Sequence, residues 1–290
     1  MKPKITALAP WFGSNRMLAH EVGAELAGCK WVGVPFAGGM TELLHIPKGA
    51  TALVNDLHQH VIHLAMVVKS PELGPKLYRR LRRTPFHPYV LEMAQRFCAT
   101  YDPPIGADWF VRDADARLNY AESYFISVWM GRSARAGDRT EFTGAPCIRW
   151  TGNGGSSATR FRSAATSLRD WRKVLHRCDF TSIDALKFVN ECNDAAGNAI
   201  YCDPPFPGPG DKYRHKFSKE QHESLSLLLG TFKQTRVVCR FYDHPLIREL
   251  YPEGDLWTWR HLKGRDQANN GEKPEVLIIN GPSYVELPST

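Results

Sequence analysis

The chain has 290 residues, 43% of them hydrophobic and 23% charged, a composition typical of a folded globular protein that excludes a disordered or collagen-like chain. No run approaches the roughly 18 apolar residues of a membrane span, and the N-terminal residues lack the apolar core of a secretory signal, so we expect a cytoplasmic protein without a membrane partner. The 37 Lys and Arg residues outnumber the 30 Asp and Glu residues, which favours a polyanionic partner.

Two strand–helix units are predicted near the N-terminus. Residues 29–36 form a short apolar run that ends at Ala37-Gly38-Gly39, and periodic apolar residues resume over 40–45, a pattern of strand, glycine turn and helix. Residues 50–54 predict a second strand ending at Asn55-Asp56, and 57–68 carry apolar residues at the spacing of a helix face. Two such units in succession predict a parallel sheet.

From about 70 to 170 the apolar periodicity is less regular, and Ser123–Trp129 is the clearest strand candidate. We expect an insertion with its own small fold. It is rich in arginine, and its first group of arginines fits either a solvated helix face or a phosphate-contacting surface. The segment 152–162 fits equally a phosphate-contacting loop or an ordinary flexible loop.

The α/β pattern resumes after the insertion. Residues 199–202 predict a strand that runs into Asp203, and 236–241 and 276–279 predict two more strands. Ser218–Phe232 predicts a helix in which Ser218 is the N-cap and Gln221 completes a capping box. No internal repeat is found.

Other residue types that often mark a site are interpreted here as structural. The seven cysteines include no C-x-x-C pair, which predicts reduced, mostly buried thiols. His58, His60 and His63 suggest a metal site, but side chains at i and i+2 do not share a helix face, so we expect surface residues and no metal. Four tryptophans are expected to pack the core of the insertion: Trp109, Trp129, Trp150 and Trp171.

The glycine turn is the first feature that indicates a ligand. Phe36-x-Gly38-Gly39 follows the first predicted strand, and Asp56 follows the second, where an acid can accept bonds from ribose hydroxyls. Neither G-x-G-x-x-G nor G-x-x-x-x-G-K-[ST] is present, which disfavours dinucleotides and nucleoside triphosphates. The remaining candidate is a smaller adenosine ligand such as S-adenosylmethionine.

Asp203-Pro204-Pro205-Phe206 is the most specific feature of the sequence. Two successive prolines remove two backbone donors and fix φ at about −65°, so the chain leaves the strand as a rigid extended turn. Asp203 and a nearby carbonyl can accept both N–H groups of an exocyclic amine, while Phe206 can stack on the base. Asp102-Pro103-Pro104-Ile105 lacks a preceding apolar strand and an aromatic, and is interpreted as a plain turn.

With these motifs the chain resembles the Dam-type family of DNA adenine methyltransferases, in the class whose cofactor region comes first, followed by a recognition insertion and the D-P-P-[YF] motif. Residues 10–16 (PWFGSNR) are similar to the N-terminal P-[YW]-x-G-[GS]-K-x motif, although Asn15-Arg16 replaces the usual lysine-containing pair. Segments 213–225, 242–243 and 275–280 are similar to later family segments. Phe206 stands where tyrosine is commoner, and it keeps the stacking face.

The resemblance implies an α/β, Rossmann-like S-adenosylmethionine-dependent methyltransferase sheet with an inserted target-recognition domain. The catalytic domain would comprise 1–70 and 171–290, and the DNA-recognition insertion 71–170. The catalytic motif would be Asp203, Pro204, Pro205 and Phe206. The implied cofactor-binding residues are Trp11, Gly13, Ser14, Phe36, Gly38, Gly39, Asp56 and Asp184. The expected DNA-binding residues are Arg16, Arg79, Arg80, Arg82, Arg83, Arg132, Arg135, Arg160 and Arg162.

The implied reaction is direct methyl transfer to the N6 amine of an adenine flipped out of double-stranded DNA, at a site-specific sequence, as in restriction–modification systems of bacteria or phages. No metal or obligatory protein partner is implied. Two alternatives stay open. The target could be an RNA adenine, or the protein could be a catalytically inactive DNA-binding relative, given Asn15 and Phe206.

Overall fold

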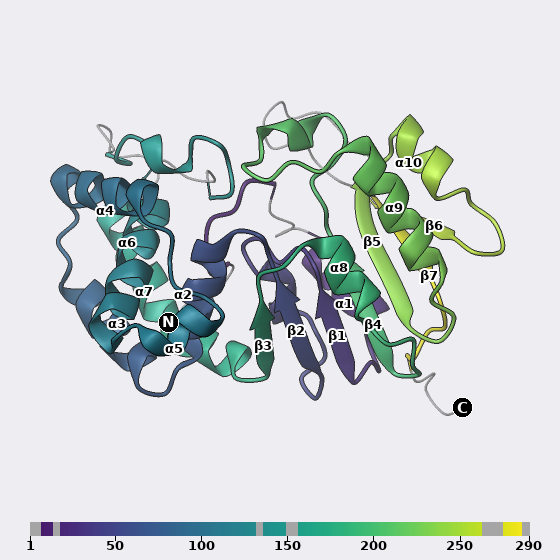
Figure 1. Ribbon diagram of the computed structural model, residues 1–290, viewed down its shortest axis with the longest axis horizontal. Coiled ribbons are helices and arrows are strands. Elements are labelled where there is room, and N and C mark those ends of the chain that lie inside the picture. Colours follow the sequence, from purple (N-terminus) through teal and green to yellow (C-terminus); the bar gives the residue numbers. More distant parts are fainter. Residues whose placement is uncertain (1–6, 14–17, 132–135, 149–155, 263–274, 286–290) are drawn as a thin grey trace. The chain divides into compact units, whose positions relative to one another are not determined.

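Figure 1 shows the computed structural model, which describes residues 7–13, 18–131, 136–148, 156–262 and 275–285. The chain divides into two compact units. The first unit comprises Met1–Ser14, Gly38–Thr41 and His58–Ser182, and the second comprises Asn15–Ala37, Glu42–Leu57 and Ile183–Thr290. The division places α2 (Gln59–Lys69) in the first unit, whereas the predicted insertion begins at residue 71.

In the described part of the chain, seven strands form a sheet in the order β3-β2-β1-β4-β5-β7-β6. Their bounds are β1 Trp31–Val34, β2 Thr51–Asn55, β3 Cys178–Thr181, β4 Asn198–Cys202, β5 Arg236–Tyr242, β6 Thr258–Leu262 and β7 Glu275–Asn280. Strands β2, β1, β4 and β5 are parallel, and β7 runs antiparallel between β5 and β6. This is a doubly wound, Rossmann-like order with one antiparallel strand added, so the predicted α/β, Rossmann-like fold class is confirmed.

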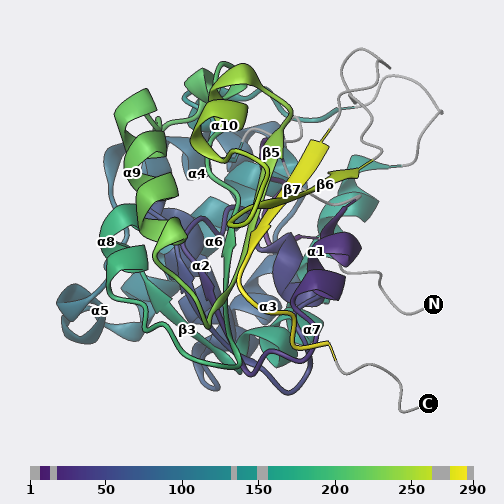
Figure 2. The same cartoon turned by 90° about the vertical axis from the view of Figure 1, so that its right-hand side faces the viewer.

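The strands of the second unit are apolar, which suits a sheet whose two faces are both covered. All six residues of β7 and the inner five of β5 are buried, as expected for a sheet covered on both sides. Figure 2 shows α8 (Ala185–Asn190) and α9 (Lys219–Gly230) on one side of these strands and α1 (Ala19–Glu25) on the other. The remaining short helices of the unit are η1 Thr41–Leu44, η3 Pro209–Lys212 and α10 Pro245–Leu250, of which η1 begins in the first unit's Gly38–Thr41 segment.

The predictions for the second unit are confirmed at the level of its elements. The predicted strands correspond to β1, β2, β4, β5 and β7. Ser218 caps α9, and both hydrogen bonds of the predicted capping box with Gln221 are present. The helix expected over 40–45 is a single 3-10 turn, η1, because Pro47 and Gly49 follow it closely.

The first unit is helical. Its helices are α2, α3 Leu73–Arg83, α4 Pro88–Thr100, α5 Ala107–Val111, α6 Ala114–Met130 and α7 Ser157–Leu175, with a 3-10 turn η2 at Glu141–Thr143. Helix α6 packs against α2, α3, α4 and α7 and is the centre of the unit. The segment 102–105 is an irregular connection between α4 and α5.

The prediction of a strand at Ser123–Trp129 was wrong, because these residues lie within the 17-residue helix α6. The run contains aromatic and β-branched residues that favour strands. In the fold, Tyr124 to Val128 are all buried, since neighbouring helices surround this part of α6. Burial on several sides removed the 3.6-residue periodicity that would have indicated a helix.

The prediction that His58, His60 and His63 lie at the surface was also wrong, because their exposed fractions are 2%, 3% and 1%. Helix α2 packs against α3, α6 and α7, so it has almost no solvent-facing side. His58 Nε2 lies 2.6 Å from Glu141 Oε2, and both ring nitrogens of His63 contact backbone carbonyls. Within the described residues no group of three or more His, Cys, Asp or Glu side chains is arranged for a metal.

The other structural predictions have mixed outcomes. All seven cysteines are free thiols, five buried and two half-buried, as predicted. Trp109 and Trp171 are buried in the helical unit, Trp129 is half-buried, and Trp150 lies outside the described residues. Among the helices that the structure describes, none has the length and apolar character needed to cross a membrane.

Candidate functional site

The expected catalytic motif lies at the carboxyl end of β4, in the middle of the second unit's sheet. Asp203 follows Cys202, the last and fully buried residue of that strand, and Pro204 is buried as well. The Phe206 carbonyl accepts a hydrogen bond of 2.7 Å from the Gly210 amide, which closes the turn into η3. Ligands of doubly wound sheets bind at this edge, outside the carboxyl ends of the parallel strands.

The Asp203 carboxylate is held by a buried arginine of the neighbouring strand. Arg240 Nη1 donates to Oδ1 at 3.2 Å and to Oδ2 at 3.0 Å, and Tyr201 Oη lies 3.4 Å from Oδ2. Arg240 Nε donates to Glu275 Oε2 at 2.6 Å. Burial raises the pKa of Asp203, and the Arg240 charge opposes that rise.

Phe206 is half-buried beside the same arginine. Its ring centroid lies 5.1 Å from the Arg240 guanidinium carbon, 4.6 Å from the Tyr242 ring and 5.9 Å from the Phe241 ring. The Tyr242 contact is edge-on, at 75° between planes. These contacts place the ring beside the same arginine that holds the Asp203 carboxylate.

The charge of Asp203 contributes to the pKa values of two further groups, Glu42 and Tyr213. Glu42 on η1 is 6% exposed, and burial raises its pKa to about 8, with the charges of Asp203 and Asp56 contributing. Glu42 Oε1 is buried and has no hydrogen-bond partner among the described residues. Burial also raises the pKa of Tyr213, the residue after η3. Arg240 and Glu42 were not predicted as site residues, although an isolated charge inside the apolar run RVVCRFY indicates a buried ion pair.

Asp56 and Asp184, the two acids of this unit that are expected to bind the cofactor, each follow a residue of one hydrogen-bonded pair, Asn55 and Ile183. Asn55, fully buried at the end of β2, is hydrogen bonded to Pro35 and Ile183. Asp56 and Asp184 come next in each segment. Asp184 also has a structural role, because its Oδ1 accepts hydrogen bonds from the Leu186 and Lys187 amides and caps α8. Phe36 packs edge-on against Phe217 at 5.3 Å.

The glycine turn packs closely against the N-terminal segment of the first unit. A Cβ on Gly38 would lie 2.9 Å from the Trp11 ring, and one on Gly39 would lie 2.6 Å from the Ala9 carbonyl oxygen. Gly38 also has φ of +46°. Both glycines are therefore required for Trp11 to pack here. Gly13 is exposed, and Ser14 and Arg16 lie outside the described residues.

The first arginine group lies on α3, and its members have different surroundings. Arg80 Nη2 contacts Asp115 at 2.7 Å, and Nη1 lies 3.4 Å from Glu122, both on α6. Arg79, Arg82 and Arg83 are exposed and have no carboxylate partner within the described residues. Arg80 is thus an ion-paired residue, and the other three form an exposed positive surface without carboxylate partners in the described chain, called here the α3 arginine face.

The second arginine group is only partly described. Arg132 and Arg135 lie outside the described residues. The segment from Ser157 is not a loop but the start of α7, whose N-cap is Ser156. Arg160 is half-buried and its Nη2 donates to the Trp129 and Gly131 carbonyls, so it fixes the end of α6. Arg162 is exposed one turn before Thr166, whose hydroxyl accepts from Arg82 at 3.2 Å.

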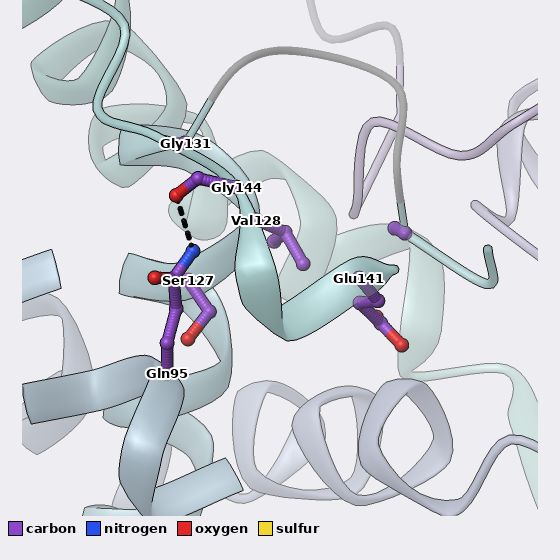
Figure 3. A pocket seen from close by; sticks show the side chains of 7 residues that line it. Gln95, Ser127, Val128, Gly131, Glu141 and Gly144 are labelled. Carbon is purple, nitrogen blue, oxygen red and sulfur yellow. Dashed lines mark hydrogen bonds between the residues drawn. The ribbon is translucent and has the colours of Figure 1, made fainter. Parts of the chain in front are cut away.

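A small cavity of about 10 Å³ lies in the helical unit, enough for one water molecule. Figure 3 shows its lining, with the hydrogen bond of 2.8 Å from Gln95 Nε2 to the Gly144 carbonyl. Its other lining residues are Ser127, Val128, Gly131, Ala136 and Glu141. None of the expected catalytic or cofactor residues lines it, and it is too small for a nucleobase.

No protein-family model and no curated protein matches the chain. A similar solved structure is SMU.472, described as a candidate methyltransferase and crystallised with SAH, at 14% sequence identity and a TM-score of 0.28. The match covers 72% of this chain and spans 57% of the length of that one. A similarity of this size says nothing about activity.

Proposed function

We propose that the protein is an S-adenosylmethionine-dependent methyltransferase that methylates the N6 amine of a flipped adenine in double-stranded DNA. The observation that carries the proposal is the arrangement at the end of β4. A half-buried, arginine-held carboxylate is followed by two prolines and an aromatic ring that lies beside the same arginine. A carboxylate accepts hydrogen bonds only, so it suits the N–H donors of an amine.

The acids of the second unit fit the proposed cofactor. Asp56 follows β2 and Asp203 follows β4, the two strands that pair with β1 on either side in the parallel sheet, and the charges of both act on Glu42. Glu42 Oε1 is a buried polar atom without a partner in the described chain, so the site has an unused polar group. When bound, the cofactor would supply an electrophilic methyl group, whose C–S electron pair returns to sulfur as the amine nitrogen bonds to carbon.

The residues of this chain would mainly position the target. Asp203 and a carbonyl of Pro204-Pro205 would accept the two N–H groups, which directs the nitrogen lone pair at the methyl group. The face of Phe206 would recover part of the few kcal/mol that flipping the base costs. After transfer the positively charged amine releases its proton readily, so Asp203 need not be a strong base. The α3 arginine face would contact phosphates without reading sequence.

The test uses the two D-P-P segments of the chain as a matched pair. Asp203→Ala should abolish transfer of labelled methyl groups to genomic DNA while calorimetry still detects cofactor binding. Asp102→Ala changes an exposed aspartate before two prolines and should leave activity intact. Nuclease digestion and mass spectrometry of the product should yield N6-methyladenine. Methylcytosine in the product, or normal turnover by Asp203→Ala, would refute the proposal. Methylation confined to RNA would instead support the alternative of an RNA adenine target.

A further inference from the structure

Arg240 is a buried arginine of the second unit that forms ion pairs with two carboxylates, Asp203 and Glu275. Its side chain is 5% exposed and lies on β5, between β4, which leads to Asp203, and β7, which begins at Glu275. The side chains of Asp203 and Glu275 are 18% and 10% exposed. One guanidinium thus binds two carboxylates, of which Glu275 is buried and Asp203 half-buried, and its carbon lies 5.1 Å from the Phe206 ring centroid.

The two carboxylates are bound differently. Glu275 Oε2 accepts a short hydrogen bond of 2.6 Å from Nε, at the base of the guanidinium. Asp203 accepts hydrogen bonds from a single guanidinium nitrogen, Nη1, which lies 3.0 Å from Oδ2 and 3.2 Å from Oδ1. A carboxylate has about four acceptor sites, so Asp203 keeps acceptor capacity for a ligand. Glu275 anchors the arginine, and the arginine orients Asp203.

A second ion pair of the same strand shows what a purely structural contact looks like. Arg236, at the other end of β5, donates from Nη2 to Glu25 Oε2 at 2.6 Å, and their side chains are 12% and 16% exposed. Arg236 Nη1 also donates to the Gly281 carbonyl. This pair joins α1 to the sheet and is remote in sequence from the D-P-P-F turn. It provides a control with the same chemistry and similar burial.

We propose that Arg240 is a positioning residue for methyl transfer, held by Glu275 so that it keeps Asp203 in the carboxylate form and fixes Phe206 beside it. The inference rests on the proposed function. A buried carboxylate without its counter-ion would take up a proton, and a protonated Asp203 loses acceptor sites for the target amine. Phe206 would lose the cation beside its ring in the same step.

The groups that act on Asp203 determine the sign of the effect. Burial and the charge of Glu275 raise the pKa of Asp203, whereas Arg240 and the Tyr201 hydroxyl lower it. The remaining titratable neighbours, whose own pKa values respond to the Asp203 charge, are Glu42, Cys202 and Tyr213. Removing Arg240 should therefore raise the pKa of Asp203, and removing the charge of Glu275 should lower it.

The experiment compares four variants by the pH dependence of kcat and by cofactor affinity: Arg240→Met, Arg240→Lys, Glu275→Gln and, as control, Arg236→Met. Arg240→Met should lower kcat at pH 7 with little change in cofactor Kd and shift the acid limb of the profile upward by about one unit or more. Glu275→Gln should shift it downward, and Arg240→Lys should restore part of the activity. Arg236→Met should lower stability without moving the limb.

A direct titration separates this inference from the proposed function. The carboxyl carbon of Asp203 can be followed by NMR in ¹³C-aspartate-labelled protein without DNA and assigned with Asp203→Asn. Opposite shifts of its titration in Glu275→Gln and in Arg240→Gln, which removes the positive charge but stays polar, support the role of Arg240, even where Arg240→Met does not fold. Unchanged titration and pH profiles in both variants would overturn it. A wild-type protein inactive on DNA and RNA would refute the proposed function, while the titration would still report the charge control of Asp203.

Discussion

The side-chain amide of Asn55 is hydrogen bonded to both backbone groups of Ile183: Nδ2 donates to the carbonyl at 3.0 Å, and Oδ1 accepts from the amide at 2.9 Å. Nδ2 also donates to the Pro35 carbonyl at 3.0 Å. One fully buried side chain therefore joins the ends of β1 and β2 to the segment before α8. Asp56 and Asp184, the two acids expected to bind the cofactor, are each the next residue along the chain.

Replacing Asn55 should be costly for stability. Asn55→Leu removes the partner of one buried and two part-buried backbone groups. Each group left unsatisfied costs about 1–3 kcal/mol, partly relieved by local relaxation and by water at Ile183. We expect a loss of about 3 kcal/mol in the free energy of unfolding, measured in urea. Asn198→Leu is the control, since the Asn198 side chain donates a single, longer hydrogen bond of 3.3 Å to the Asn193 carbonyl in the described chain. Equal losses in the two variants would contradict the role of Asn55.

The second prediction separates the two roles of Asp184. Its Oδ1 caps α8, so Asp184→Ala should lower stability by about 1 kcal/mol, whereas Asp184→Ser retains a capping oxygen and should cost less. The family role requires the carboxylate itself, so both variants should weaken cofactor binding in calorimetry. If Asp184→Ser binds the cofactor as the wild type does, Asp184 is a helix cap only.

The sequence predicted the sheet of the second unit well for a physical reason. Its strands are short apolar runs bounded by turn residues, as before Asp203, and such runs are recognisable without tertiary context. The role of Arg240 was missed because its partners come from other strands, and the sequence around a strand does not show which residues it will meet across the sheet. Likewise, α6 around Ser123–Trp129 and the histidines of α2 were misjudged, because helices buried on several sides lose the one-sided pattern on which the predictions depended.

The third prediction concerns stability at acidic pH. His222 on α9 is 2% exposed between the rings of Phe217 and Phe241, and burial lowers its pKa from 6.5 to about 4. Above pH 6.5 the folded and unfolded states both hold it neutral, so it has no effect. Below pH 6.5 only the unfolded state takes up the proton, so stability falls as the pH decreases toward 4, by about 3 kcal/mol.

The His222→Leu variant should lack that part of the acid sensitivity. Urea denaturation at pH 7, 5.5 and 4 would give the difference between variant and wild type at each pH. His63, whose pKa burial also lowers, is present in both proteins and cancels in the difference. A difference that is constant with pH would mean that His222 is protonated equally in the two states.

The last prediction concerns the α3 arginine face, Arg79, Arg82 and Arg83. If these exposed residues neutralise phosphates, replacing all three with Gln should weaken binding to every DNA sequence alike. The slope of log K against log salt concentration should become shallower by about 0.9 for each lost contact. Arg80→Gln is the matched control on the same helix. Because Arg80 is already paired with Asp115 and Glu122, it should change stability and leave the slope as it is. Filter binding across a salt series measures both, and an unchanged slope in the triple variant would show that the α3 arginine face is an ordinary solvated surface.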